Sequence, residues 1–200
     1  AKYEETSVEI KGGTITAEKD AILLTNGKNG TIAVSGGTFS SKVLPEYCAD
    51  GFVPKNNGNG TYGVEVDTSV AEVNGVKYKT LQAAVDAATR NATVKLLADT
   101  RENVTISTPY VTLDLNGHTL NGSTGERKPA LTITARMTVK DSSEAQTGTI
   151  MREDTAENSG VSSHYVIDVQ GGGWLTFESG TVKNDSGAGG TKGASLVRVG

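Results

Sequence analysis

The chain of 200 residues is long enough for one or two domains with a buried core. Its formal net charge of −4 is distributed without a basic stripe, which argues against a nucleic-acid partner. No apolar run approaches the roughly 18 residues that cross a bilayer, so no membrane span is predicted, and the single cysteine, Cys48, excludes a disulfide within the chain.

A repeated phrase lies near the start of the chain, as VEIKGGTI at 8–15 and IAVSGGTF at 32–39, and returns as LTFESGTV at 175–182. In each copy a short strand of alternating polarity runs into a glycine corner, followed by Thr and an apolar residue. A plainer strand, AILL at 21–24, separates the first two copies. Such repetition indicates a stacked architecture in which each unit buries its apolar face against its neighbours.

The segment 40–66 differs from the repeats, because it holds proline and Asn-Gly turns but no glycine-corner strand. We interpret it as the end of a stack that finishes in a hairpin around Asn57–Gly60. A boundary is then expected at 67–70. The predicted organisation is therefore a first part at 1–66, a linker at 67–70 and a second part at 71–200.

One segment has helical periodicity. In TLQAAVDAAT at 80–89, Leu81, Ala84, Val85 and Ala88 share one helical face, and Thr80 is a suitable N-cap. This pattern predicts a short amphipathic helix. Placed before a run of short strands, such a helix would cover the exposed apolar end of the stack.

Between 111 and 200, glycine-corner strands alternate with plain ones. The glycine-corner strands lie at 111–120, 137–150 and 175–182, and the plain strands at 130–133, 165–169 and 195–199. Each strand is short and alternates in polarity, which suits one buried and one solvated face.

The order of these parts is unusual, because an ending precedes a beginning. If Gly200 is joined to Ala1, the alternation of strands continues unbroken. Three explanations are open: a piece cut out of phase from tandem domains, two unrelated half-domains, or molecules that stack head to tail, a contact that does not close and makes filaments. The expected assembly interface comprises Val8, Ile10, Ile15, Leu196, Val197 and Val199.

Several strings carry a resemblance to a known family: TLQAAVDAA at 80–88, ATVKLLADTRENVTIS at 92–107, VTLDLNGHTLNG at 111–122 and TVKDSS at 138–143. They resemble the right-handed parallel β-helix, or pectate-lyase-like, domains of large secreted surface proteins from gut Firmicutes. The segment from SGGTFSS to NGNGTYGVEV resembles the end of such domains. The resemblance implies a secreted or surface-attached bacterial protein, adhesive or carbohydrate-associated.

The expected fold is therefore all-β, a right-handed parallel β-helix (solenoid) with one short capping α-helix. Residues 1–66 would form the C-terminal coils and closing hairpin of a β-helix, and 71–200 the capping helix and N-terminal coils. Asn116 is expected to start a ladder of stacked amides between coils.

Pectate-lyase-like folds include lyases and hydrolases that use paired carboxylates, or Ca²⁺ with a basic residue. Asp114 and Asp168 alternate with apolar residues and are expected to face outward. No convergent catalytic pair is recognisable, so no catalytic residue, cofactor or enzymatic activity is assigned. His118 and His164 lack a second ligand at metal-binding spacing, so no metal site is predicted.

Trp174 follows three glycines and, with Tyr165, could stack on a sugar face; alternatively it covers a corner of a coil. Three functions follow. The first is a structural building block of a surface stalk or head-to-tail filament, which associates with itself or with tandem copies of the same domain. The second is a carbohydrate-binding adhesin module with glycans as partners, and the third a polysaccharide lyase or hydrolase.

Overall fold

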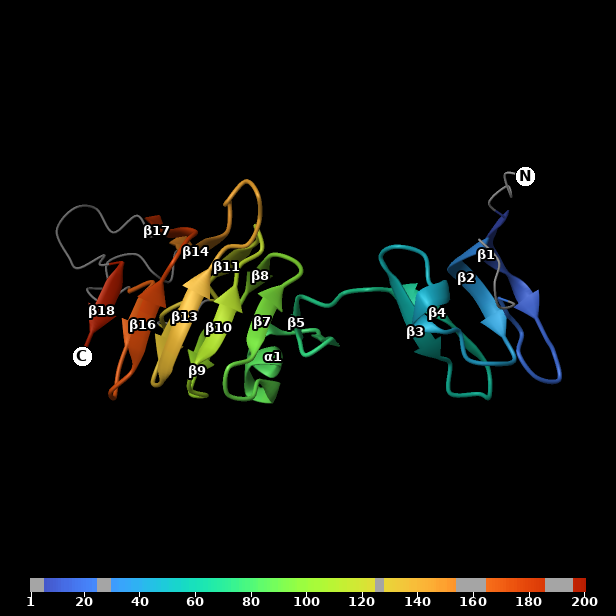
Figure 1. Ribbon diagram of the computed structural model, residues 1–200, viewed down its shortest axis with the longest axis horizontal. Helices are drawn as coiled ribbons and strands as arrows, with labels where there is room; N and C mark the ends of the chain where they lie inside the picture. Colours follow the sequence, from blue (N-terminus) through green and yellow to red (C-terminus); the bar gives the residue numbers. More distant parts are fainter. Residues whose placement is uncertain (1–5, 25–29, 125–127, 154–164, 186–195) are drawn as a thin grey trace, which may run out of the picture. The chain divides into compact units, whose positions relative to one another are not determined.

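The computed structural model describes residues 6–24, 30–124, 128–153, 165–185 and 196–200. The chain divides into two compact units, Ala1–Thr68 and Ser69–Gly200, called unit 1 and unit 2 below. Most of the described residues with regular structure are in strands (Figure 1). Among the described residues, no helix has the length and hydrophobicity that crossing a membrane requires.

Unit 1 is built on one sheet, sheet A, with the strand order β1-β2-β4-β3. Its elements are β1 (Thr6–Ile15), β2 (Gly30–Phe39), a 3-10 turn (Pro45–Tyr47), β3 (Phe52–Asn56) and β4 (Tyr62–Val66). Strands β1 and β2 are parallel, whereas β3 and β4 form an antiparallel hairpin. The small core comprises Val34, Phe39, Val43 and Tyr47.

The predicted plain strand at 21–24 is wrong, because this segment is irregular in the structure. Here side-chain hydroxyl groups accept hydrogen bonds from backbone N–H groups that would otherwise bind a neighbouring strand. The Ala21 N–H donates to the Ser41 hydroxyl at 2.7 Å, and the Leu24 N–H donates to the Tyr47 hydroxyl at 3.3 Å. Local bonds of this kind offer the backbone an alternative to a ladder.

Unit 2 contains three further sheets. Sheet B has the order β16-β13-β10-β7-β5-β6, sheet C has β17-β14-β11-β8, and sheet D has β18-β15-β12-β9. The strands of sheet B are β5 (Ala71–Val73), β6 (Val76–Tyr78), β7 (Thr93–Leu96), β10 (Val111–Asp114), β13 (Arg136–Lys140) and β16 (Trp174–Phe177). Those of sheet C are β8 (Thr100–Arg101), β11 (Thr119–Asn121), β14 (Thr149–Glu153) and β17 (Thr181–Asp185). Those of sheet D are β9 (Val104–Ile106), β12 (Leu131–Ile133), β15 (Ile167–Val169) and β18 (Val197–Val199).

From β7 onward the chain visits sheets B, C and D in turn, and each pass adds one strand to each sheet. Every pairing between successive passes is parallel, and the arrows of β7, β10, β13 and β16 point the same way in Figure 1. Among the described strands of unit 2, the antiparallel pairs are β5 with β6 and β5 with β7. Unit 2 therefore confirms a mostly β structure with parallel sheets and one helix.

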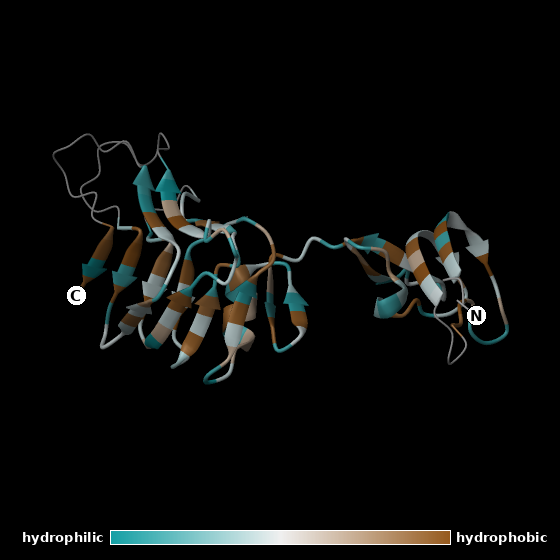
Figure 2. Cartoon of the chain, turned by 45° about the horizontal axis from the view of Figure 1, so that its top comes forward, coloured by the Kyte–Doolittle hydropathy of each residue, from teal (hydrophilic) through white to brown (hydrophobic). Residues whose placement is uncertain are grey.

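Alternation of polarity places one row of side chains from each strand in the core. In sheet B the register aligns Val94, Leu113 and Val139, and all three are fully buried. Sheet C adds Leu120 and Ile150 in the same way. Figure 2 shows the alternation as hydrophobic bands between hydrophilic ones along the strands.

The helix α1 (Leu81–Ala87) confirms the predicted amphipathic segment. The Thr80 hydroxyl accepts a hydrogen bond from the Ala83 N–H at 3.2 Å, as expected of an N-cap. The Glu102 carboxylate accepts from the N–H groups of Leu81 and Gln82 and thus also binds the first turn. Leu81, Ala84 and Val85 are buried against the core of unit 2.

The side chain of Gln82 covers the edge of sheet D. Its amide oxygen accepts from the Thr105 N–H at 2.8 Å, and its amide nitrogen donates to the Thr105 carbonyl at 3.2 Å. The carboxamide thus occupies the place that the backbone of another strand would take beside β9. Because an unpaired strand edge invites further strands, this contact closes β9 to addition.

Candidate functional site

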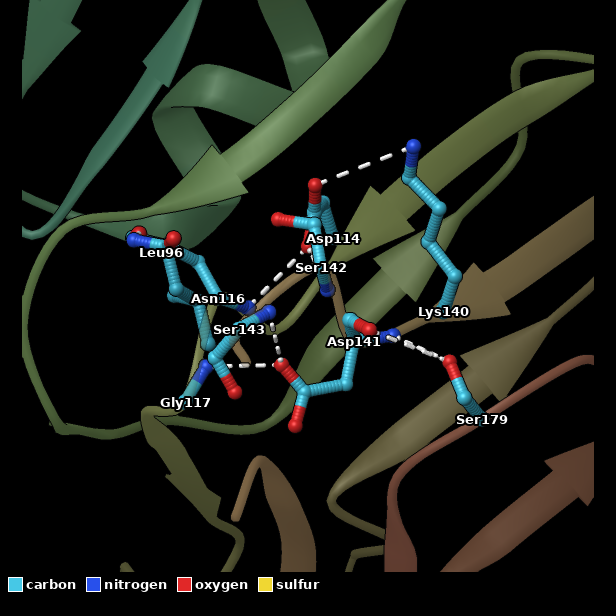
Figure 3. Close-up of polar contacts among 9 residues, drawn as sticks. All are labelled: Leu96, Asp114, Asn116, Gly117, Lys140, Asp141, Ser142, Ser143 and Ser179. Atoms are coloured by element: carbon cyan, nitrogen blue, oxygen red, sulfur yellow. Dashed lines mark hydrogen bonds and ion pairs between the residues drawn. The ribbon is translucent and has the colours of Figure 1, made fainter. Parts of the chain in front are cut away.

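Buried carboxylates line the corners between sheets B and C (Figure 3). Asp141 follows β13, and its carboxylate accepts from the N–H groups of Gly148 at 2.6 Å, Gly117 at 2.8 Å and Ser143 at 3.0 Å. The Ser179 hydroxyl of the next pass accepts from the Asp141 N–H at 2.8 Å. Asp141 therefore joins three successive corners through their backbones.

Asp114 performs the same role one pass earlier. Its carboxylate accepts from the N–H groups of Asn116 at 3.1 Å and Ser142 at 3.0 Å, and Lys140 Nζ lies 3.8 Å away (Figure 3). Asp114 was expected to face outward. Instead these neighbours cover its side chain, and the residue is buried. The Asn116 amide donates to the carbonyl of Leu96 rather than to another amide, so the predicted amide ladder is wrong at this position.

Asp168 is buried on β15 and is also occupied. Arg198 of β18 donates from Nε to its carboxylate at 2.7 Å and also from a terminal nitrogen, and Gln170 donates to the same group. The Arg198 guanidinium lies 4.8 Å from the ring centroid of Tyr165. The acid expected to face outward is therefore buried and forms an ion pair with the partly exposed Arg198, which joins the last two described strands of sheet D.

The carboxyl groups of Asp141 and Asp168 are held ionised. Burial is the largest single influence on Asp141 and raises its pKa, but the N–H donors of Ser143, Gly148 and Gly117 together lower the pKa below its ordinary value. For Asp168 the hydrogen bonds from Arg198 are the largest influence, and they too lower the pKa. Carboxylates fixed in this way stabilise corners and strands rather than exchange protons near neutral pH.

The described residues hold no group of three or more His, Cys, Asp or Glu placed to bind a metal ion. The side chain of His118 lies beside Asp99, with 3.5 Å between Nδ1 and Oδ1. His164 lies outside the described residues.

The last pass of unit 2 exposes apolar side chains that are buried in earlier passes. In sheet B, Phe177 lies beside Val139 in register, yet Phe177 is 38% exposed while Val139 is fully buried. In sheet D, Val197 and Val199 are 44% and 80% exposed, whereas their neighbours on β15 are buried. Among the described residues, β16, β17 and β18 each pair on one side only.

Unit 1 has an equivalent edge at β1. Val8 is 49% exposed, while Ile10 and Ile15 are half-buried. Their counterparts on β2 are better covered, since Val34 pairs with Ile10 and is fully buried. Sheet A ends at β1, which pairs with β2 alone among the described strands.

The residues expected to form an assembly interface thus all lie on or beside edge strands. Val8, Ile10 and Ile15 belong to β1, and Val197 and Val199 to β18, with Leu196 directly before it. Sequence reasoning missed Leu175, Phe177 and Val182 on β16 and β17, which belong to the same open edge. Their membership of the repeated phrase was the signal that could have identified them.

The two aromatic residues proposed as a sugar platform each lie against a different arginine. Tyr165, which precedes β15 in the chain, stacks on Arg198. Trp174, the first residue of β16, stacks on Arg136. Trp174, which is 57% exposed, instead ends a row that crosses sheet B. The row runs Arg90, Tyr110, Arg136 and Trp174, with guanidinium-to-ring distances of 4.0, 5.7 and 4.8 Å.

Neither Arg90 nor Arg136 has a carboxylate partner among the described residues, so the row presents two cations held by aromatic rings. Tyr110 is held in the left-handed region, with φ of 63°, which is uncommon for a bulky side chain.

Comparisons of the chain with protein-family models, with curated proteins and with solved structures gave no match.

Proposed function

We propose that this chain is a structural building block of an extracellular stalk or filament, and that its two units are parts of right-handed parallel β-helices that grow by pairing open strand edges. One observation supports this most: apolar positions that are fully buried in interior passes are more exposed at β1, β16 and β18. Rows that continue in register up to an edge are complementary to a further pass of the same kind.

The strand edges favour pairing on two physical grounds. Each presents unpaired backbone N–H and C=O groups, and a new parallel strand would satisfy them. Each half-exposed Val, Leu or Phe would gain about 1 kcal/mol when covered. Association opposes this with a cost of about 4–15 kcal/mol. We therefore expect assembly that depends on concentration.

At the other end of unit 2 the edge of sheet D is capped, whereas β6 and β8 each keep one unpaired side among the described strands. There α1 packs on β5 and β9, and Gln82 fills the edge of β9 beside Thr105. In unit 1 the hairpin β3–β4 pairs with β2 only through Phe39 and Tyr62 and ends the parallel part of sheet A. At these ends the parallel stacking of sheets A and D therefore stops.

The location and the partner follow from the same proposal. We place the protein outside the cell, on a bacterial surface, because its sequence resembles domains of secreted surface proteins. The partner is a second copy of the chain or a tandem copy of the same domain. Either partner supplies the strands that the open edges lack.

Sedimentation velocity of the purified chain over a wide concentration range tests this proposal. We expect the mass to rise with concentration, and a variant with a charge on the edge, Phe177→Lys, to stay monomeric. Lys95→Glu, a charge change on an interior strand, is the control and should assemble normally. A wild-type chain that stays monomeric throughout would refute the proposal.

The row of arginines and aromatic rings favours a second candidate function, the binding of acidic glycans. Aromatic rings stack on sugar faces, and Arg90 and Arg136 are free of carboxylate partners in the described part of the chain. A glycan array probed with the wild type and with Trp174→Ala and Arg136→Ala tests this. Retention of acidic glycans by both variants would exclude the row as the binding site, and Tyr165→Ala serves as the comparison outside the row.

A further inference from the structure

The open edge of unit 2 and the open edge of unit 1 carry the same strand and corner. Leu175 and Phe177 on β16, Gly180 in the corner and Val182 on β17 have the spacing of Val8, Ile10, Gly13 and Ile15 on β1. The two corner glycines also share a left-handed backbone, with φ of 101° at Gly180 and 87° at Gly13. The likeness is thus one of conformation as well as of sequence.

The stacking of β2 on β1 shows how one such corner sits on another. At Gly36 a Cβ atom would lie 2.5 Å from the carbonyl oxygen of Lys11, so only glycine fits there. Gly37 has φ of 111° and stands over the carbonyl oxygen of Gly13. Close backbone approach is therefore what the first corner glycine allows.

Gly12 occupies the same place in β1 as Gly36 in β2, yet nothing here requires a glycine. A Cβ atom at Gly12 would meet no atom within 4 Å, and its φ lies outside the left-handed region. The steric reason for glycine appears only when another short corner lies against β1. The corner 178–180 at the open edge of unit 2 has the same length as the corner 11–13.

Charge agrees with this fit. On the outer face of sheet B the register places Lys95, Asp114 and Lys140 side by side, and Glu178 follows Phe177 at the next position. Signs therefore alternate from pass to pass. Glu178 is exposed and has no ion-pair partner among the described residues. Lys11 is the residue of β1 that matches it, and a cation continues the alternation.

We propose that β1 of one copy stacks in parallel on β16 and β17 of a second copy, in a single register. Val8 lies beside Leu175, Ile10 beside Phe177 and Ile15 beside Val182. Gly12 then stands over the carbonyl group of Glu178, as Gly36 stands over that of Lys11. This register rests on the proposed function and defines the contact from which the filament is built.

Disulfide cross-linking tests the register. Glu9→Cys and Thr176→Cys, made in separate chains that also carry Cys48→Ser, place two thiols in matching outward positions. Neighbouring parallel strands lie about 4.8 Å apart, within disulfide reach. We expect mixed, mildly oxidised chains to form a covalent dimer. The control replaces Thr176→Cys by Thr112→Cys, which changes the same residue type about three strand spacings from β1 of the second copy and should not link.

The outcomes separate this inference from the proposed function. If the chains assemble but the Glu9→Cys and Thr176→Cys pair gives no more covalent dimer than the control pair, the register is wrong while the proposed filament is not contradicted. A chain that never assembles and never links overturns both. If a single chain that carries both Glu9→Cys and Thr176→Cys, with Cys48→Ser, forms the disulfide within itself at high dilution and stays monomeric, the second copy is the wrong occupant.

Gly12→Val provides an independent test, because its side chain meets open space within the chain itself. We expect the circular dichroism of the variant to be unchanged and its assembly to weaken at least tenfold. Ser7→Val, a similar change at another exposed position of β1, should assemble like the wild type. Undiminished assembly of folded Gly12→Val would overturn the proposed contact.

Discussion

Replacement of Asp141 by alanine should destabilise unit 2 strongly. Its carboxylate accepts three backbone hydrogen bonds, and the bond from the Gly148 N–H, at 2.6 Å, is fully buried. The bonds from Gly117 and Ser143 are partly buried. Alanine leaves all three donors in the closed corner without their acceptor.

The expected loss follows from these three bonds. A hydrogen bond to a charged group contributes about 1.5–3 kcal/mol, and a buried donor left without a partner loses this in full. Water can reach the two partly buried donors, so we assign each a smaller loss of about 0.5–1 kcal/mol. The free energy of unfolding of unit 2 should therefore fall by about 2.5–5 kcal/mol in Asp141→Ala.

Urea unfolding followed by tryptophan fluorescence measures this loss, because the one tryptophan, Trp174, lies in unit 2. With a slope of about 2 kcal/mol per molar urea, the midpoint should move by roughly 2 M. The control Glu144→Ala removes an exposed acid from the same loop and should change stability by less than about 0.5 kcal/mol. A loss below about 1 kcal/mol in Asp141→Ala would refute this account of the corners.

Three further changes test other parts of the structure. Leu120→Ala removes a fully buried side chain of sheet C and should lower the free energy of unfolding by about 2–5 kcal/mol in the same urea assay. Gln82→Leu leaves both edge groups of Thr105 without the carboxamide and should speed amide hydrogen exchange at Thr105, while unchanged exchange would contradict a capping role. Arg198→Ala removes the group that contributes most to lowering the pKa of Asp168. A carboxyl group with a lowered pKa stabilises the fold at pH values above its ordinary pKa of 3.8, and this stabilisation is lost as the pH falls below that value. The stability difference between wild type and Arg198→Ala should therefore be constant near neutral pH and shrink below about pH 4, and a difference that grows on acidification would contradict this assignment.

Local patterns in the sequence were sufficient for the helix of unit 2 and for strands within 111–200. Period-two alternation identified the strand at 165–169, and helical spacing with the Thr80 cap identified α1. The same reasoning failed at 21–24, where the apolar run suits a strand but hydroxyl groups of Ser41 and Tyr47 take its backbone donors. Those partners are distant in sequence, so no local pattern reveals them.

The contacts between passes could not be predicted, because loops of unequal length separate the passes. Asp114 alternates with leucines and was therefore expected on the solvated face, but the backbone of Ser142, one pass later, covers it. The row that joins Arg136 to Tyr110 and Trp174 likewise depends on the register across those loops. The edge residues of β1 could be inferred early, since the repeated phrase marks equivalent positions, but Leu175, Phe177 and Val182 of the same phrase were missed.

The central claim is that the open strand edges pair and extend the stack. Electron microscopy of the concentrated protein, with analysis of the periodicity along any fibre, tests it most directly. Strands that lie across the axis of a growing stack should give a strong repeat of about 4.7–4.9 Å along that axis. Isolated particles at every concentration, or fibres that lack this repeat, would contradict the claim.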